Sequence, residues 1–266
     1  MGVYLLPCIV TTSLRAGAEQ VELAARISEQ TGLPLVERGK KSISGLAAEW
    51  NARAVIVVKA DKVTCIMGEK EFFFHPGLAG LRIKEIKRGK TDQMIDAMAL
   101  KPGHEVLDCT LGLGTDAIVA SYFVGKTGRV VGLESSVVLA LLVRMGMQLY
   151  KDARREVIEA MRRIVINNAD HYEILAGLPE NSYDVVYFDP MFRVPRMKSC
   201  SINAFRMLAD DRPLTPKVIR LALRVARRRV VVKENRAGNE LKRLGFQLLT
   251  GGKNSAVAYG IMQKGV

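Results

Sequence analysis

Apolar residues in the first 80 positions alternate between strand-like and helix-like spacings. Val21, Leu23 and Ile27 recur at helical spacing, and Gly32 follows where that helix should end. The predicted elements are, in order, a strand at 4–13, a helix at 18–32, a short strand at 33–39, a helix at 42–51, and two or three strands within 54–76. This pattern predicts a small N-terminal α/β domain over residues 1–80.

The pattern changes after residues 81–98, which are typical of a basic link that runs into a helix. From residue 104 onward, a strand, a turn and a helix follow one another repeatedly. The predicted strands are 104–110, 128–135, 164–170, 183–190 and 229–235, and a hairpin is expected within 245–262. The predicted helices are 114–125, 136–151, 153–163, 171–179 and 216–228. The helix at 153–163 is charged and could continue from the helix before it. This alternation predicts an α/β fold with a parallel, doubly wound sheet over residues 81–266, and ligands at the carboxyl ends of its strands.

Composition narrows the range of partners. The chain has 266 residues and is 48% hydrophobic, which is enough for a sizeable core. Lys and Arg number 40 against 27 Asp and Glu, a formal net charge of +13 that favours a polyanion such as nucleic acid as partner. A soluble protein that is merely basic is the alternative.

Cysteine and histidine patterns indicate a cytoplasmic protein without a metal site. The four cysteines form no C-x-x-C pair and are typical of reduced thiols, and the three histidines lie too far apart for a metal-ligand spacing. The first 13 residues lack a charged region, and their apolar run is too short to span a bilayer. We therefore expect neither export nor membrane anchoring.

A glycine-rich turn, VLDCTLGLGTDA, joins the strand at 104–110 to the next helix. Gly112 and Gly114 would let the backbone approach a ligand closely, and the free N–H groups at the start of the helix could bind it. With Ala117 the turn also matches the dinucleotide fingerprint G-x-G-x-x-A. A tight turn without a ligand is the alternative.

Asp108 helps to distinguish the two cofactors that such a turn could bind. In a dinucleotide fold the glycines usually follow the strand directly and bind pyrophosphate, whereas here a carboxylate ends the strand before Gly112. Asp108 would repel pyrophosphate but could hold the ammonium group of S-adenosylmethionine. The order D-x-x-x-G-x-G is similar to the first motif of class I methyltransferases.

Two further acids are expected at the ends of neighbouring strands. Glu134 would accept hydrogen bonds from both ribose hydroxyls of either cofactor. Asp170 would lie near the adenine, where a carboxylate can accept a hydrogen bond from the exocyclic amine. For Asp170 a helix N-cap is the alternative.

Residues 189–192, Asp-Pro-Met-Phe, resemble the (D/N/S)-P-P-(Y/F) motif of methyltransferases that act on exocyclic or amide nitrogens. An aromatic amine is a poor nucleophile because its lone pair is delocalised into the ring. Asp189 and the carbonyl of Pro190 could accept its two N–H bonds and direct the lone pair at the methyl group. Phe192 could stack on the base. A strand-ending turn with a buried Phe is the alternative.

Basic residues lie on both sides of this core and could contact nucleic acid phosphates. The candidates are Arg193, Arg196 and Lys198 after the motif, and Lys84, Lys87, Arg88 and Lys90 in the basic link. For the residues of the link, a solvated face is the alternative.

Five segments together resemble the bacterial small-subunit ribosomal RNA guanine-N2 methyltransferases. In order they are RGK, VLDCTLGLGTDA, LES, VVYFDPMF…KS and RVVVKE, and the resemblance covers about residues 88–262. It implies a Rossmann-like, seven-stranded methyltransferase sheet, S-adenosylmethionine as the methyl donor and a guanine amine of ribosomal RNA as the acceptor. It also implies cofactor contacts at Thr115, Asp116, Glu134, Ser135, Asp170 and Asp189. Thr115 stands where the family usually has Arg, and residues 1–80 do not obviously match.

We therefore expect an S-adenosylmethionine-dependent N-methyltransferase that acts on an exocyclic amine of RNA, guanine N2 of small-subunit ribosomal RNA above all. One alternative is the same chemistry on transfer RNA, DNA or a protein. Another is a non-catalytic RNA-binding protein that keeps the fold. A nicotinamide oxidoreductase fits less well, because the glycine loop is misplaced for it and no proton donor lies beside the loop.

Overall fold

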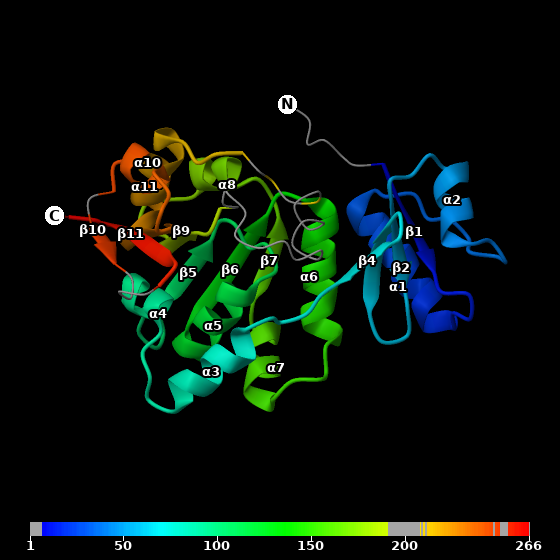
Figure 1. Ribbon diagram of the computed structural model, residues 1–266, viewed down its shortest axis with the longest axis horizontal. Helices are drawn as coiled ribbons and strands as arrows, with labels where there is room; N and C mark the ends of the chain where they lie inside the picture. The colour runs from blue at the N-terminus through cyan, green and yellow to red at the C-terminus, as the bar shows by residue number, and fades with distance from the viewer. Residues whose placement is uncertain are drawn as a thin grey trace.

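The described part of the chain forms two β-sheets. The structure, a computed structural model, describes residues 7–190, 208, 210, 212–246, 248–250 and 255–265. Figure 1 shows the four-stranded sheet at the right, coloured blue to cyan, and the seven-stranded sheet at the left.

The smaller sheet has the strand order β1-β2-β3-β4. Its strands are β1 (Cys8–Thr12), β2 (Ala54–Val58), β3 (Val63–Met67) and β4 (Lys70–Phe73). β1 and β2 are parallel, and the other neighbours are antiparallel. Helix α1 (Ala18–Thr31) packs on one face and α2 (Ile43–Glu49) on the other. These elements agree with the expected small α/β unit.

The short strand predicted at 33–39 is wrong in extent. A single bridge forms there, between Leu35 and Val10. Pro34 has no N–H to donate to a ladder, and the chain turns at Gly39, which has a φ of 50°. The apolar run is therefore too interrupted to pair further.

The larger sheet has the order β10-β11-β9-β8-β5-β6-β7. Its strands are β5 (Glu105–Asp108), β6 (Arg129–Glu134), β7 (Val165–Asn168), β8 (Tyr183–Phe188), β9 (Ala226–Asn235), β10 (Leu248–Thr250) and β11 (Val257–Gln263). The strands β5 to β9 are parallel, while β10 and β11 form an antiparallel hairpin that pairs with β9 at one edge. The predicted doubly wound α/β sheet is confirmed.

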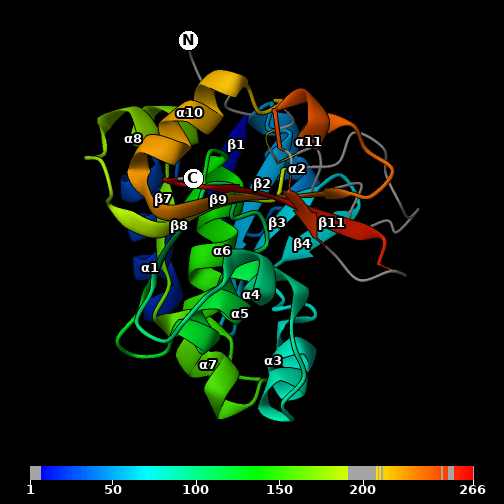
Figure 2. The same cartoon turned by 90° about the vertical axis from the view of Figure 1, so that its left-hand side faces the viewer.

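Helices cover both faces of the larger sheet, as Figure 2 shows. On one face lie α8 (His171–Gly177), α10 (Pro216–Val225) and α11 (Glu240–Arg243); on the other lie α3 (Ala79–Lys87), α4 (Gln93–Met98), α5 (Thr115–Val124) and α7 (Arg155–Arg162). Neighbouring residues of a strand point to opposite faces, so Val185 enters one core and Val186 the other. Burial on both faces explains the continuous apolar runs of β8 and β9.

Helix α6 (Val137–Leu149) lies between the two sheets (Figure 1). Leu141 and Leu142 pack against the smaller sheet, and Leu139 and Val143 pack in the core of the larger one. A helix that is apolar all round needs such burial on both sides. The division of the chain into domains at residue 80 stays a prediction, because α6 contributes to the cores of both sheets.

Several predicted boundaries need correction. The basic link is itself helical, since α3 spans Ala79–Lys87 and α4 follows it. Helix α7 does not continue α6, because the chain leaves the helical conformation at Tyr150. β9 begins at Ala226, inside the predicted helix, because pairing with β8 outweighs helix propensity there.

Cys8, Cys65 and Cys109 are free and buried. Among the described helices, none has the length and apolar character needed to cross a membrane.

The strand order of the larger sheet reverses at β5. β6 and β7 lie on one side of β5, and β8 and β9 lie on the other. In open α/β sheets, such a reversal opens a crevice at the carboxyl ends of the strands, where ligands bind. The ends of β5, β6 and β8 are therefore the place to look for a site.

Candidate active site

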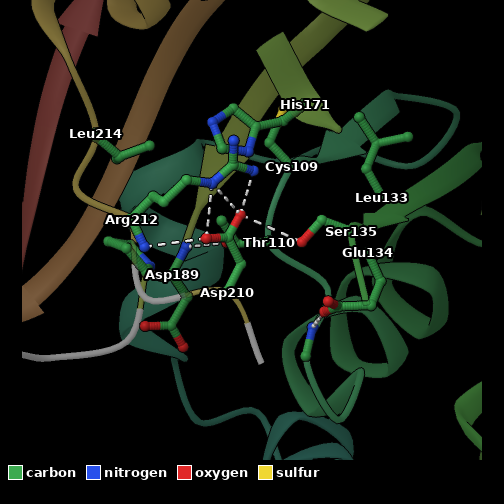
Figure 3. A pocket seen from close by; sticks show the side chains of 12 residues that line it. Cys109, Thr110, Leu133, Glu134, Ser135, His171, Asp189, Asp210, Arg212 and Leu214 are labelled. Atoms are coloured by element: carbon green, nitrogen blue, oxygen red, sulfur yellow. Dashed lines mark hydrogen bonds and ion pairs between the residues drawn. The ribbon is translucent and has the colours of Figure 1, made fainter. Parts of the chain in front are cut away.

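A pocket lies at the carboxyl ends of β5, β6 and β8 (Figure 3). Its lining residues are Cys109, Thr110, Gly112, Leu133, Glu134, Ser135, His171, Asp189, Pro190, Asp210, Arg212 and Leu214. The predicted site residues that the pocket brings together are Gly112, Glu134, Ser135, Asp189 and Pro190. Residues that are up to about 100 positions apart in the sequence thus line one pocket at the edge of the sheet.

The turn after β5 is held between the two neighbouring strands. The N–H of Cys109 donates to Tyr187 of β8, and the N–H of Leu111 donates to Leu133 of β6. Gly112 and Gly114 have φ values of 51° and 74°, in the left-handed region that favours glycine. A Cβ on Gly114 would lie 2.3 Å from Cε of Met147, so the flexible end of that side chain would have to move. Gly112 faces the pocket instead.

Glu134 ends β6 and is bound by backbone on its inner side. Its Oε2 accepts from the N–H of Gly112 at 3.1 Å, and its Oε1 accepts from the N–H of Ser136 at 2.9 Å. Burial raises the pKa of Glu134 to about 7, against the lowering effect of those two N–H groups. Because it is aimed by the turn and lines the pocket, Glu134 is suited to accept hydroxyl hydrogen bonds.

Asp189 follows β8 and is fixed at both its backbone and its side chain. Its N–H donates to Oγ1 of Thr110 at 2.6 Å, and its Oδ2 accepts from Nζ of Lys233 at 2.7 Å. Burial raises the pKa of Asp189 to about 6, while the ammonium of Lys233 acts in the opposite direction. The carboxylate therefore reaches the pocket in a fixed direction, next to Pro190.

Asp116 does not line the pocket but anchors a buried group of charges behind it. Its Oδ1 accepts from Arg82 at 2.5 Å, and its Oδ2 accepts from Lys233 at 2.9 Å and from the hydroxyl of Tyr187 at 2.7 Å. Arg82 also forms a bidentate pair with Asp92, the N-cap of α4. Binding of the cofactor by Asp116 stays a prediction.

Asp108 and Thr115 also lie outside the pocket lining. Asp108 is buried, its Oδ1 accepts from the N–H of Thr110 at 3.0 Å, and burial raises its pKa to about 8. Oγ1 of Thr115 lies near Gly77, where a Cβ would be 3.1 Å away. Thr115 thus faces the segment that leads from the smaller sheet. The predicted cofactor contacts of both residues, and of Gly114, stay predictions.

Asp170 lies at the start of α8, as its N-cap, rather than within β7. Its Oδ1 accepts from the N–H groups of Tyr172 and Glu173, which is the alternative considered from the sequence. Its Oδ2 pairs with Arg212, which also binds Asp210. Burial acts to raise the pKa of Asp170, but Arg212 and the backbone bring it below the usual value. An adenine contact by Asp170 stays a prediction.

The sequence interpretation missed the segment before α10. Arg212 and Asp210 line the pocket, and Oγ of Ser135 donates to Asp210 at 3.2 Å; Figure 3 draws these contacts as dashed lines. No local pattern marks these residues, since they follow no predicted strand. Thr110 was also missed, although its place between Asp108 and Gly112 in the turn was a usable signal.

The predicted phosphate contacts are only partly within the described residues. Arg88 and Lys90 both pair with Glu85, and Lys87 pairs with Glu156 at 2.8 Å. Helix α3, which leads to Arg88, packs on the face of the sheet opposite to α8 (Figure 2). Nucleic acid binding by Arg88 and Lys90 stays a prediction. Phe192, Arg193, Arg196 and Lys198 lie outside the described residues.

The pocket suits a cationic ligand better than a pyrophosphate. Glu134, Asp189 and Asp210 bring three carboxylates to its lining, and the cation in that lining, Arg212, is already paired with Asp170 and Asp210. The ammonium and sulfonium groups of S-adenosylmethionine fit this charge, and the hydroxyls of its ribose fit Glu134. Around Gly112 the nearest atom to an added Cβ is 3.8 Å away, which leaves room for close approach. Among the described residues, no group of three His, Cys, Asp or Glu is placed to hold a metal ion.

Comparisons with known proteins agree with this interpretation. The chain matches the family model described as "Putative SAM-dependent methyltransferase" over residues 44–257. The match begins within the first 80 residues, so the similarity extends further than the motifs between 88 and 262 indicated. A Bacillus subtilis protein named "Uncharacterized protein YpiP" is 37% identical over 255 residues, which are 96% of this chain and 99% of that protein.

A more distant relative and a solved structure add detail. The "Ribosomal RNA small subunit methyltransferase J" of Coxiella burnetii is 29% identical over 180 residues, 63% of this chain and 65% of that protein. A solved structure of a SAM-dependent methyltransferase from Neisseria gonorrhoeae covers 96% of both chains with a TM-score of 0.62 and 18% identity, which supports the fold. The chain therefore belongs to the family of S-adenosylmethionine-dependent methyltransferases, and S-adenosylmethionine is its cofactor.

Proposed function

We propose that this methyltransferase acts on an exocyclic amine of RNA, the N2 amine of a guanine in small-subunit ribosomal RNA. The observation that carries the proposal is that Asp189 and Pro190, an acid-proline pair, line the same pocket as Gly112 and Glu134. The relatives named "Ribosomal RNA small subunit methyltransferase J" and the net charge of +13 support RNA as the substrate. A cytoplasmic location belongs to the same proposal, since ribosomal RNA is found there.

In this proposal, the residues of the chain prepare a poor nucleophile. S-adenosylmethionine supplies a methyl group on a sulfonium, which leaves as a neutral thioether. Asp189 accepts one N–H of the guanine amine and the carbonyl of Pro190 accepts the other, which makes the nitrogen more tetrahedral, reduces the delocalisation of its lone pair and directs that lone pair at the methyl group. As the N–C bond forms, the nitrogen becomes cationic, and the carboxylate of Asp189 stabilises it and accepts the surplus proton.

The arrangement also fixes the orientation of the two reactants. The N–H of Asp189 is held by Thr110, and the turn that carries Thr110 also carries Gly112, which binds Glu134. The acceptor of the amine and the proposed acceptor of the cofactor ribose are thus joined through one short turn. Holding two reactants in fixed relative positions removes much of the entropic barrier of a bimolecular step.

The substrate can be identified by comparing modified nucleosides in cells with and without the gene. We expect N2-methylguanosine in small-subunit ribosomal RNA to fall by one residue per molecule, measured by mass spectrometry of digested RNA. Wild-type protein should restore it, and the Asp189→Asn variant should not. If ribosomal RNA keeps all its methyl groups while transfer RNA or DNA loses one, the target is wrong; if no nucleoside changes, the nucleic acid proposal fails.

Glu134→Gln should weaken binding of S-adenosylmethionine by roughly 10- to 100-fold, because a charged hydrogen-bond acceptor is lost. In the wild type, affinity should also fall as the pH drops below about 7, since Glu134, with a pKa of about 7, must be ionised to accept from both hydroxyls. The variant should lose most of this pH dependence. Isothermal calorimetry from pH 6 to pH 8 measures both effects.

Glu173→Gln is the matched control, because Glu173 is an exposed acid on α8 and makes the same chemical change. Its affinity for S-adenosylmethionine should equal that of the wild type. Equal affinities of the Glu134 variant and the wild type across this pH range would remove Glu134 from the cofactor site.

A further inference from the structure

Lys233 lies near the carboxyl end of β9, where its ammonium bridges two carboxylates. Its Nζ is 2.7 Å from Oδ2 of Asp189 and 2.9 Å from Oδ2 of Asp116. Phe188 of β8 pairs with Val232 of β9, and Asp189 and Lys233 are the next residues after this pair on the two neighbouring segments. The side chain of Lys233 is only 19% exposed. A lysine among the valines of β9 is therefore placed by the register of the two strands directly behind the pocket.

We propose that Lys233 is a positioning residue for methyl transfer, which holds one oxygen of the Asp189 carboxylate and leaves the other for the target amine. The proposal rests on the proposed role of Asp189 as the amine acceptor. Lys233 binds Oδ2 of Asp189, and no described residue donates a hydrogen bond to Oδ1, the oxygen that the proposal assigns to the amine. A carboxylate that was free to rotate would present either oxygen, in many directions.

Lys233 acts here as a fixed positive charge, not as a base. Burial would lower the pKa of Lys233, but Asp189 and Asp116 together raise it above its usual value, so it stays protonated. The side chain of Asp189 is partly buried, 28% exposed, and the loss of water around it favours the neutral form of the carboxyl, which has a proton where the amine must donate one. The ammonium of Lys233 opposes this and keeps the carboxylate able to accept.

A network of hydrogen bonds behind Lys233 holds its ammonium in place, so that the ammonium does not move if the side chain of Asp189 moves. Asp116 is held by Arg82 at 2.5 Å and by the Tyr187 hydroxyl at 2.7 Å, and Asp116 in turn holds Lys233. Arg82 comes from α3, Asp116 from α5 and Tyr187 from β8. Three elements thus fix a single ammonium. The other ionisable groups that act on this cluster are Asp108, Asp92 and Tyr259.

The test compares Lys233→Met and Lys233→Arg with the wild type. Lys233→Met should lower kcat at saturating substrates by at least about tenfold at pH 7, and should move the acid limb of the pH profile of kcat upward by about one to three pH units. Lys233→Arg keeps the charge and should keep the acid limb. Calorimetry should find S-adenosylmethionine binding within about threefold of the wild type in both variants, which separates positioning from cofactor binding.

Lys264→Met is the matched control. Lys264 pairs with Asn181 and the carbonyl of Arg224, and its N–H donates to Arg228, at the opposite end of β9 from Lys233. The same substitution there should leave both kcat and the acid limb unchanged.

A second measurement does not depend on turnover. Carbon-13 NMR of protein labelled at the aspartate carboxyl carbons, with the Asp189 signal assigned through Asp189→Asn, should show Asp189 titrating at higher pH in Lys233→Met. If the wild type transfers no methyl group to RNA, the proposed substrate fails while this titration still tests Lys233. If the wild type is active but Lys233→Met keeps both its kcat and the titration of Asp189, only the role of Lys233 fails. Should Lys233→Met not fold, an acid limb that moves upward in Lys233→Arg would overturn the proposal, and an unmoved limb with a lower kcat would support it.

Discussion

Asp189→Asn should lower kcat by roughly 10²- to 10³-fold at saturating S-adenosylmethionine and RNA. The amide has nearly the shape of the carboxylate, but it carries no charge to stabilise the cationic nitrogen and cannot accept its proton. The N–H of Asp189 donates to Thr110, and this backbone contact survives the substitution. Cofactor affinity should therefore stay close to that of the wild type, and single-turnover transfer of a labelled methyl group should separate the two effects.

Asp184→Asn is the control for this experiment. Asp184 lies on the same strand, β8, but at its opposite end, where it pairs with Arg227 and Arg228. Its kcat should match that of the wild type even if the variant is less stable. Full turnover by Asp189→Asn, with normal binding of S-adenosylmethionine, would show that transfer does not need the carboxylate.

Asp116→Asn should lower the free energy of unfolding, measured without cofactor, by about 3 kcal/mol, the lower end of the range for breaking a buried ion pair. Removing this carboxylate leaves Arg82 and Lys233 with one buried counter-charge fewer, although each keeps a second partner, Asp92 and Asp189 respectively. For a chain of this size, the loss corresponds to a fall in Tm of about 10 °C. Differential scanning calorimetry measures it directly.

The pH dependence of this difference has a definite sign. Burial alone would raise the pKa of Asp116, but Lys233, Arg82 and Tyr187 bring it well below its usual value of 3.8. A carboxyl group whose pKa is lower in the folded than in the unfolded state stabilises the fold above its unfolded pKa, and this contribution is lost as the pH falls through the folded value. The gap in stability between the wild type and Asp116→Asn should therefore be full above about pH 5 and shrink below about pH 4.

Asp96→Asn provides the comparison, because Asp96 is an exposed residue of the short helix α4. A surface substitution of this kind should change the free energy of unfolding by no more than about 0.5 kcal/mol. If Asp116→Asn were as mild as Asp96→Asn, the charge cluster would contribute nothing to stability.

The sequence alone predicted the fold class, the cofactor and several of the residues that line the pocket. Strand, turn and helix signals are local, so Asp108 and Glu134 could be assigned to strand ends and Gly112 to the turn between β5 and α5. Parallel strands bring their carboxyl ends to one edge, and this rule was enough to expect Glu134 and Asp189 in one pocket. The order of these short motifs along the chain also pointed to the methyltransferase family, which the comparisons confirmed.

The tertiary structure alone decided which charges meet. Lys233 is 117 residues from Asp116 in the sequence and 44 from Asp189, and Tyr187 is 71 residues from Asp116. With 40 basic and 27 acidic residues in the chain, very many pairings are compatible with the sequence. Most charges stay in water, where a pair contributes little. Only the packing of α3, α5, β8 and β9 removes this particular set from water, and burial is what makes the choice of partner matter.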